Sequence, residues 1–172
     1  MRELVPDLQT LAVLSNTNHP GEQAEHDATK AATNTLSIRL TYVPFVSGLE
    51  LEGALGRVRG SGAGAMLVFP EGVTMVHRAK IAEFARMHRL PSMFGWREYC
   101  EAGGLMSYGA NQRQAYVRLA TYADRLLRGE KPGDLPIEQP TTFELVVNLG
   151  TARALGLTVP PSLFSLIDEV ID

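Results

Sequence analysis

Residues 65–69 have the sequence AMLVF, five apolar side chains in an unbroken row. Such a row is typical of a parallel strand covered on both faces, and Pro70 ends it because proline cannot donate to a sheet ladder. Residues 73–89 follow with a helical spacing of apolar side chains, in which Val76 and Met87 are expected to face the sheet. This stretch therefore predicts one strand and helix unit of a parallel α/β sheet.

The same unit recurs on both sides of this stretch. Short runs that predict strands occur at residues 11–15, 37–43, 92–95 and 104–107, and helix-forming segments occur at residues 22–36 and 49–58. Strands that alternate with helices at this interval pair in parallel through right-handed crossovers. The sequence therefore predicts an α/β fold with an open parallel sheet flanked by helices.

The last third of the chain contains one long predicted helix. Asn111 is a good N-cap with Gln114 in capping-box position, and the helix runs to Arg128 and ends at Gly129. Its apolar stripe consists of Tyr116, Leu119, Ala120, Ala123 and Leu127. The Pro-rich residues 130–140 must be extended or looped, residues 142–148 predict a strand, and residues 151–156 and 160–172 predict closing helices.

The composition limits the classes of function. The 172 residues suffice for one domain with a proper core, and a formal charge of -3 gives no basic surface for nucleic acid. The single cysteine, Cys100, cannot form an internal disulfide. The four histidines show no metal-ligand spacing. The sequence therefore predicts no metal, no cofactor and no nucleic-acid partner.

Nothing in the sequence predicts a signal peptide or a membrane span. Residues 1–15 contain Pro6 and charges where a signal peptide needs an unbroken apolar region. Nowhere do the roughly 18 consecutive apolar residues of a membrane span occur. On these residues alone the protein is expected in the cytoplasm, if Met1 is the true start.

Catalytic motifs are missing from the places where an enzyme would need them. The glycines of residues 60–64 precede a strand, whereas a phosphate-binding loop follows one and opens a helix. Ser107 lacks one flanking glycine of a nucleophile elbow, and no histidine follows it. Tyr108 has Gln112 where a reductase would have lysine, and the acids beside Cys100 would raise its thiol pKa, which favours a packing role. The sequence therefore predicts a protein that is not an enzyme.

Loops at the carboxyl ends of the predicted strands offer a binding site instead, because open α/β sheets bind ligands at that edge. Their amide, hydroxyl, acidic and aromatic groups suit a small zwitterion or polar aromatic compound. Gly109 is expected to let the chain bend as it leaves its strand. The candidate ligand-binding residues are Asn16, Thr17 and Asn18 for polar contacts, Glu71 for a ligand cation, and Trp96, Tyr108 and Asn111 for the cleft wall and hinge.

Several long blocks of the sequence agree with a known family in order and spacing. They are REYCEAGGLMSYG at residues 97–109, ADRLLRGEKPGDLPIEQPTTFELVVNL at residues 123–149 and ALGLTVPPSL at residues 154–163. Upstream, residues 3–20 and 77–91 also fit. Over nearly its whole length the chain resembles the C-terminal part of the ABC-transporter substrate-binding proteins of the tryptophan/tyrosine type.

The resemblance implies the Rossmann-like or flavodoxin-like lobe of a type I periplasmic binding protein, whose two lobes clamp a ligand by hinge closure. It implies that residues 1–106 form the second lobe, that residues 107–140 are a crossover strand, a helix and a Pro-rich segment normally docked on a first lobe missing here, and that residues 141–172 are a returning strand and C-terminal helices. A small amino-acid-like ligand, aromatic ones included, an ABC permease as partner and a periplasmic location are implied as well.

A helix that normally docks on another lobe needs a surface for its stripe of Tyr116, Leu119, Ala123 and Leu127, because burial of each large side chain is worth ~1.5–3 kcal/mol. The hypothesis that follows is a homo-oligomer, formed by exchange of this helix across a dimer. An alternative from another class is an orphaned lobe that acts as a cytoplasmic sensor or oligomeric interaction domain. An enzyme of the flavodoxin-like class ranks third, because the sequence has no glycine loop or flavin-stacking pattern.

Overall fold

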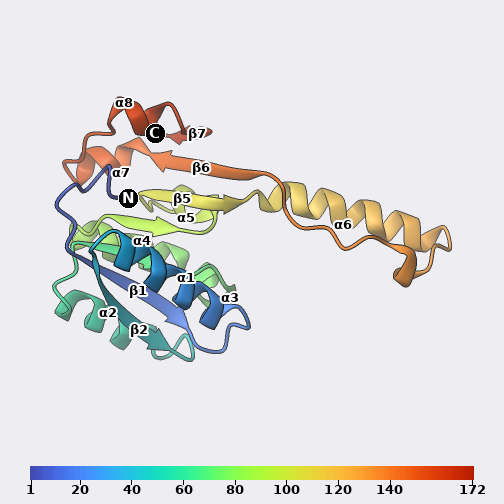
Figure 1. Ribbon diagram of the computed structural model, residues 1–172, viewed down its shortest axis with the longest axis horizontal. Coiled ribbons are helices and arrows are strands. Elements are labelled where there is room, and N and C mark those ends of the chain that lie inside the picture. The colour runs from blue at the N-terminus through green and yellow to red at the C-terminus, as the bar shows by residue number, and fades with distance from the viewer.

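The computed structural model describes residues 1–172 and contains one seven-stranded sheet, helices on both of its faces, and a helical arm that projects from it (Figure 1). The strands are β1 (Thr10–Asn16), β2 (Arg39–Phe45), β3 (Ala65–Val68), β4 (Ser92–Phe94), β5 (Met106–Ala110), β6 (Phe143–Asn148) and β7 (Glu169–Ile171). The helices are α1 (Glu22–Thr35), α2 (Leu51–Gly60), α3 (Gly72–Val76), α4 (Arg78–Met87), α5 (Arg97–Glu101), α6 (Gln112–Leu127), α7 (Leu149–Ala154) and α8 (Pro161–Phe164). The predicted α/β class with flanking helices is confirmed.

The strands lie in the order β2-β1-β3-β4-β5-β6-β7, and the first five pair in parallel as predicted. Leu14 of β1 lies opposite Val43 of β2 and Val68 of β3. β6 runs antiparallel to β5, with Met106 opposite Val147, because the chain returns directly from the arm instead of crossing over a helix. The sheet is therefore mixed at this edge, where the sequence predicted parallel strands only.

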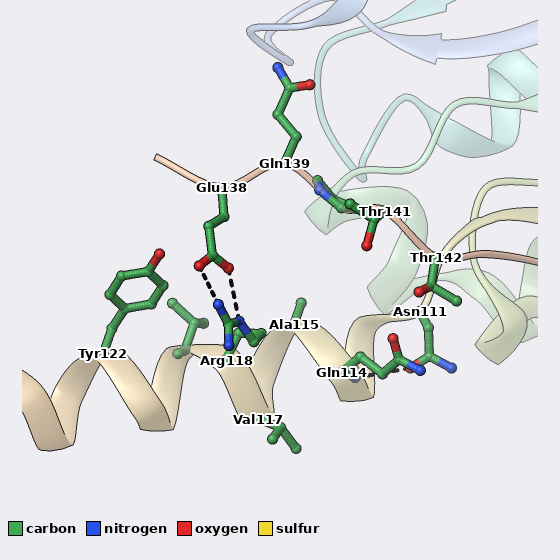
Figure 2. A pocket seen from close by; sticks show the side chains of 12 residues that line it. Asn111, Gln114, Ala115, Val117, Arg118, Tyr122, Glu138, Gln139, Thr141 and Thr142 are labelled. Atoms are coloured by element: carbon green, nitrogen blue, oxygen red, sulfur yellow. Dashed lines mark hydrogen bonds and ion pairs between the residues drawn. The ribbon is translucent and has the colours of Figure 1, made fainter. Parts of the chain in front are cut away.

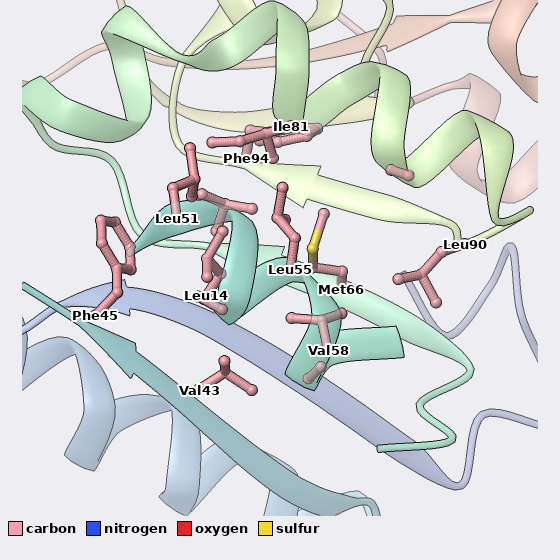
Figure 3. Close-up of a cluster of buried hydrophobic side chains, with 14 of the residues drawn as sticks. Leu14, Val43, Phe45, Leu51, Leu55, Val58, Met66, Ile81, Leu90 and Phe94 are labelled. Atoms are coloured by element: carbon pink, nitrogen blue, oxygen red, sulfur yellow. The ribbon is translucent and has the colours of Figure 1, made fainter. Parts of the chain in front are cut away.

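Alternate residues of the strands point into hydrophobic clusters on opposite faces of the sheet. Leu14 of β1 packs with Leu55 of α2 and Ile81 of α4 in the largest cluster (Figure 3). Val13 belongs to a second cluster together with Phe69. A third cluster joins β5 and β6 to α7 and α8. Apolar side chains on both faces explain the unbroken apolar runs that predicted these strands.

The predicted helix over residues 73–89 is two helices, α3 and α4, which are separated at His77. The break reorients the chain, so Val76 is 75% and Met87 is 61% exposed. The expectation that these two side chains face the sheet is therefore wrong. The face of α4 that does meet the sheet carries Ile81, Ala82 and Ala85.

The C-terminal segment also departs from its prediction. The expected helix over residues 160–172 is limited to the short α8, and the chain then forms β7 beside β6. The Asp168 carboxylate accepts a hydrogen bond from the Leu145 backbone N–H at 2.7 Å, and Glu169 pairs with Arg97 at 2.7 Å. These contacts fix the end of the chain beside β6 and α5, where it pairs as a strand instead of continuing as a helix.

The arm, residues 112–142, consists of α6 and the extended segment that returns beside it (Figure 1). None of the sixteen residues of α6 is buried. The returning segment is attached by ion pairs from Arg118 to Glu138 and from Arg125 to Glu130, and by the Tyr122 hydroxyl, which donates to the Pro136 carbonyl oxygen at 2.8 Å. Neither α6 nor any other helix combines the length and hydropathy that a membrane crossing requires.

Candidate functional site

The carboxyl ends of β1, β3, β4 and β5 lie at one edge of the sheet, because these strands are parallel neighbours. Six of the seven predicted binding residues end one of these strands or follow it, and Tyr108 lies in the middle of β5; the seven are Asn16, Thr17, Asn18, Glu71, Trp96, Tyr108 and Asn111. The topology therefore collects them along one edge, and their individual contacts distinguish their roles.

The loop after β1 presents two exposed polar side chains on a fixed backbone. Asn16 is buried, and its Oδ1 accepts a hydrogen bond from the Asn18 N–H at 3.0 Å. The Thr17 N–H donates to the Phe45 carbonyl oxygen at 2.9 Å, and Asn18 Nδ2 donates to the Val46 carbonyl oxygen at 3.3 Å. The loop is thus tied to the end of β2, with Thr17 and Asn18 exposed.

Glu71 is the N-cap of α3. Its Oε2 accepts from the Val73 N–H at 2.7 Å and its Oε1 from the Thr74 N–H at 2.6 Å. Asn16 Nδ2 donates to the same carboxylate at 3.2 Å. A buried carboxylate requires such donors, and this side chain is almost completely buried. Contact with a ligand cation stays a prediction, and it would have to share the carboxylate with three internal donors.

Trp96 lies at the start of α5, where it is the N-cap residue. Its half-buried ring packs against the largest hydrophobic cluster. The preceding residue, Gly95, lies against Pro70 so closely that a side chain on Gly95 would overlap the proline ring. The ends of β3 and β4 therefore touch at this point, and Trp96 stands directly beyond their contact.

Tyr108 and Asn111 lie where the chain crosses into the arm. Tyr108 is 54% exposed and stacks on Phe143, with 5.9 Å between ring centroids and 24° between planes. Asn111 caps α6 as predicted, because its Oδ1 accepts from the Gln114 N–H at 3.0 Å. Asn111 Nδ2 also donates to Glu144 Oε2 at 2.7 Å. These two pairs tie the outgoing and returning strands together at the base of the arm.

The bend predicted at Gly109 is wrong. Gly109 lies inside β5, which continues to Ala110, and its φ is not in the left-handed region. The glycine is required for close approach, since a Cβ there would overlap the Gly95 carbonyl oxygen. β5 therefore stays in close contact with the chain just beyond β4, at Gly95.

A groove of about 800 Å³ lies between α6 and residues 138–142. Figure 2 shows the side chain of Arg118 pointing across it to Glu138, with Tyr122 and Thr141 on its walls. The residues that line it belong to the arm, apart from Asn111 at its base. The groove is therefore a feature of the arm surface, and it does not include the loops after β1 and β3.

Sequence reasoning missed three residues that structure this edge. The Tyr99 hydroxyl donates to Thr74 Oγ1 at 2.7 Å, and Thr74 completes a capping box by accepting from the Glu71 N–H at 3.2 Å. Phe143 is the stacking partner of Tyr108. The spacing of Glu71 and Thr74 is a local signal that could have predicted the box. The contacts of Tyr99 and Phe143 carry no such local signal.

The nucleophilic side chains near this edge face the interior. Burial raises the pKa of the Cys100 thiol to about 12, so this residue stays protonated at neutral pH. Ser107 is 1% exposed. No group of three or more His, Cys, Asp and Glu side chains is arranged to hold a metal ion. The exposed groups at the edge are hydroxyls, amides and aromatic rings, which can bind a small polar molecule.

Comparison with known proteins gives one family and several solved structures. The model of the family described as ABC transporter substrate binding protein matches residues 1–171. No curated protein sequence matches significantly. An ABC domain in complex with L-Trp from Streptococcus pneumoniae superposes with a TM-score of 0.90 at 21% identity, covering 99% of this chain and 57% of that one. A conserved domain protein from Vibrio cholerae gives a TM-score of 0.86 at 20% identity, covering 98% and 57%.

A substrate-binding protein with adhesive properties from Clostridium difficile, in its ligand-free, open form, gives a TM-score of 0.71 at 19% identity. The match covers 98% of this chain and 56% of that one. The chain therefore spans between half and two thirds of the length of these solved structures. At these identities the structural likeness establishes the fold.

Proposed function

The chain belongs to the ABC transporter substrate-binding protein family, and on that premise we propose that it is one lobe of a receptor that binds a small amino-acid-like solute and delivers it to an ABC permease. The proposed role is binding without catalysis, outside the cytoplasmic membrane. In this proposal residues 1–106 form the second lobe of the receptor, residues 107–140 cross to and from the first lobe, and residues 141–172 complete the second.

The arm is the observation that carries this proposal. Next to the edge that collects the polar loops, β5 leaves the sheet and leads into α6, a helix with no buried residue. β6 brings the chain back from the arm into the sheet. Figure 1 shows this helix extending away from every other element except its own returning segment. A second lobe seated on the arm would face the polar edge and enclose a ligand against it.

The exposed groups at the edge support an amino acid as the ligand. Thr17 and Asn18 offer a hydroxyl and an amide, and the stacked rings of Tyr108 and Phe143 offer an apolar face at the base of the arm. Aromatic rings bind planar side chains by offset stacking. The bound L-Trp of the Streptococcus pneumoniae structure supports an aromatic amino acid as the first ligand to test.

The test is titration calorimetry with L-tryptophan, L-tyrosine and L-leucine on the protein that contains both lobes. Tyr108→Ala is expected to weaken L-tryptophan binding about two- to tenfold, since the loss of one aromatic stack costs about 0.5–1.5 kcal/mol. Arg59→Ala, an exposed position in the last turn of α2 on the side of the sheet opposite the polar edge, serves as the control and leaves binding unchanged. Failure of every amino acid to bind would remove the amino-acid assignment and leave the family membership standing.

The apolar stripe of α6 favours a second candidate function, self-association of the chain. Tyr116, Leu119 and Leu127 are 68%, 59% and 89% exposed, with Ala123 between them. We propose that a second copy covers this stripe when no first lobe does, because such surface is costly to leave in water. Exchange of the arm between two copies would bury both stripes.

Sedimentation velocity at micromolar concentration tests self-association. The chain is expected to sediment as a dimer, and Leu127→Glu is expected to convert it to a monomer. Leu49→Glu is a matched control, because Leu49 is 96% exposed on the body and lies far from α6 in the sequence. A monodisperse monomer of the unmodified chain would contradict the proposal.

A further inference from the structure

A buried chain of hydrogen bonds runs beneath the polar edge and joins the ends of three strands. It begins at Asn16, the last residue of β1, and passes through Glu71 after β3 to Thr74 in α3. It ends at Tyr99 of α5, which follows β4. Every side chain in it is at least nine-tenths buried. The chain of bonds therefore connects side chains that are 83 residues apart in sequence, from residue 16 to residue 99.

Both polar atoms of the Asn16 side-chain amide form hydrogen bonds within the protein. Its Nδ2 donates to Glu71, and its Oδ1 accepts from the Asn18 N–H. The Asn16 carbonyl oxygen also accepts from the His19 N–H at 3.0 Å. Asn16 therefore shapes the loop that displays Thr17 and Asn18, and a rotation of its amide would displace that loop.

Glu71 sets the orientation of the Asn16 amide. Only a group that accepts hydrogen bonds at both of its terminal atoms can take the Val73 and Thr74 N–H groups and the Asn16 NH₂ together, and a carboxylate is such a group. Because both oxygens are engaged by donors, the position of the carboxylate is fixed by the start of α3.

Tyr99 fixes Thr74, and through it the capping box. Its ring is fully buried and stacks on Phe94 at 4.7 Å between centroids. Its hydroxyl donates to Thr74 Oγ1, which in turn donates to the Phe69 carbonyl oxygen at 3.1 Å. The hydroxyl thus completes the hydrogen bonding of a threonine that has no access to water.

We propose that Glu71, Thr74 and Tyr99 are positioning residues, which hold the Asn16 amide and the Thr17–Asn18 loop in the geometry that receives the ligand. This inference rests on the proposed function of the edge. It differs from the sequence-based expectation that Glu71 itself binds the cation of the ligand, because a positioning residue affects all ligands alike.

Two ligands that differ only in the amino group separate these roles. L-tryptophan has the ammonium group that Glu71 would bind, and indole-3-propionate has the same ring and carboxylate without it. On the two-lobe protein, Glu71→Gln is expected to weaken the binding of both ligands by the same factor of about tenfold. The NH₂ group of the glutamine cannot accept a hydrogen bond, so it would face an N–H donor that the carboxylate now binds. A loss confined to L-tryptophan would overturn the positioning role of Glu71.

Tyr99→Phe tests the far end of the chain, with Tyr42→Phe as a matched control. Tyr42 also donates its hydroxyl to a side-chain oxygen, in this case of the Glu22 carboxylate, but it lies outside the chain of bonds. Tyr99→Phe is expected to weaken both ligands about threefold, and Tyr42→Phe is expected to leave them unchanged. Equal effects of the two variants would overturn the proposal.

A readout without ligand keeps the inference separate from the proposed function. In ¹⁵N-resolved NMR spectra, Tyr99→Phe and Glu71→Gln are expected to shift the Asn16 side-chain NH₂ signals and to speed their exchange with water, and Tyr42→Phe is not. An unchanged Asn16 signal in Tyr99→Phe overturns the positioning chain. If neither ligand binds the unmodified protein, the proposed ligand class fails, and this NMR comparison alone decides the inference.

Discussion

The helices α2 and α6 both carry an apolar face, but they stand in opposite surroundings. In α2, Leu51, Ala54, Leu55 and Val58 are buried among ten residues, whereas none of the sixteen residues of α6 is buried. The apolar face of α2 is covered by the sheet of its own chain, whereas the apolar stripe of α6 is exposed and the returning segment is bound by Arg118, Tyr122 and Arg125 on another face of the helix. Amphipathic sequence therefore shows that a helix needs a partner, and it does not show where that partner is.

The largest expected contrast between body and arm is at two glycines. Gly109→Ala is expected to destabilise the chain by about 4 kcal/mol, because the new methyl group would overlap a backbone oxygen that cannot move without shifting β4. Gly133→Ala in the arm has open space and should change stability by less than about 0.5 kcal/mol. Urea denaturation monitored by circular dichroism measures both. Comparable effects at the two positions would remove the contrast.

Leucine truncation gives the next largest difference. Leu55→Ala in α2 should cost about 3 kcal/mol, because a cavity opens in the largest hydrophobic cluster. Leu119→Ala in α6 should cost less than about 0.5 kcal/mol in the monomer, because this side chain is 59% exposed. Denaturation at low protein concentration is the measurement. A large loss for Leu119→Ala that appears only at high concentration would instead indicate that a second copy covers α6.

The helix caps sharpen the comparison at a smaller scale. Asn148→Ala should cost about 2 kcal/mol, because Asn148 accepts from the Thr151 N–H at 2.7 Å and donates to the buried Cys100 carbonyl oxygen at 3.0 Å. Asn111→Ala at the start of α6 should cost about 1 kcal/mol, since water can replace its bonds. Helix content from circular dichroism and the unfolding midpoint measure both losses. A larger loss for Asn111→Ala than for Asn148→Ala would contradict the view that the cap of α7 is buried and the cap of α6 is solvated.

The smallest contrast is in pH dependence. Burial raises the pKa of Glu25 above 4.5, and this cause outweighs the attraction of His19. Its contribution to stability is therefore present below pH 4.5 and lost as the pH rises through the raised pKa. A hydrogen bond from Arg118 lowers the pKa of Glu138 below 4.5, so its contribution is present above pH 4.5 and lost as the pH falls through the lowered pKa.

Substitution checks these opposite signs. Glu25→Gln should stabilise the body slightly at pH 7 and have no such effect at acid pH, whereas Glu138→Gln should loosen the returning segment at pH 7 only. Carboxyl ¹³C titrations locate the two pKa values on either side of the ordinary value of 4.5. Both carboxyls titrating on the same side would remove this part of the comparison.

Several local features could be predicted from the sequence with accuracy. The apolar run at residues 65–69 forms a covered strand, and Asn111 caps α6 through Gln114. Helix periodicity and capping depend on residues three or four positions apart, so the sequence alone contains the signal. The loops at the carboxyl edge were predictable as well, because the alternation of strands and helices places the loops after parallel strands at one edge of the sheet.

Contacts between distant residues were not predictable in this way. The end of the chain forms β7 because Asp168 and Glu169 bind Leu145 and Arg97, 23 and 72 positions away. Gly109 is constrained by Gly95 and not by a turn of its own. Each of these outcomes depends on a neighbour that arrives only when the sheet is assembled.

By itself, the sequence determined the α/β class, the long capped helix and the set of polar loops, because periodicity and capping operate within a few residues of one another. Only the tertiary structure decided that the Glu71 carboxylate also holds Asn16, that Tyr99 completes this chain of bonds, and that α6 packs against no core. Burial and hydrogen-bond partners are properties of packing, and packing joins residues that the sequence keeps far apart.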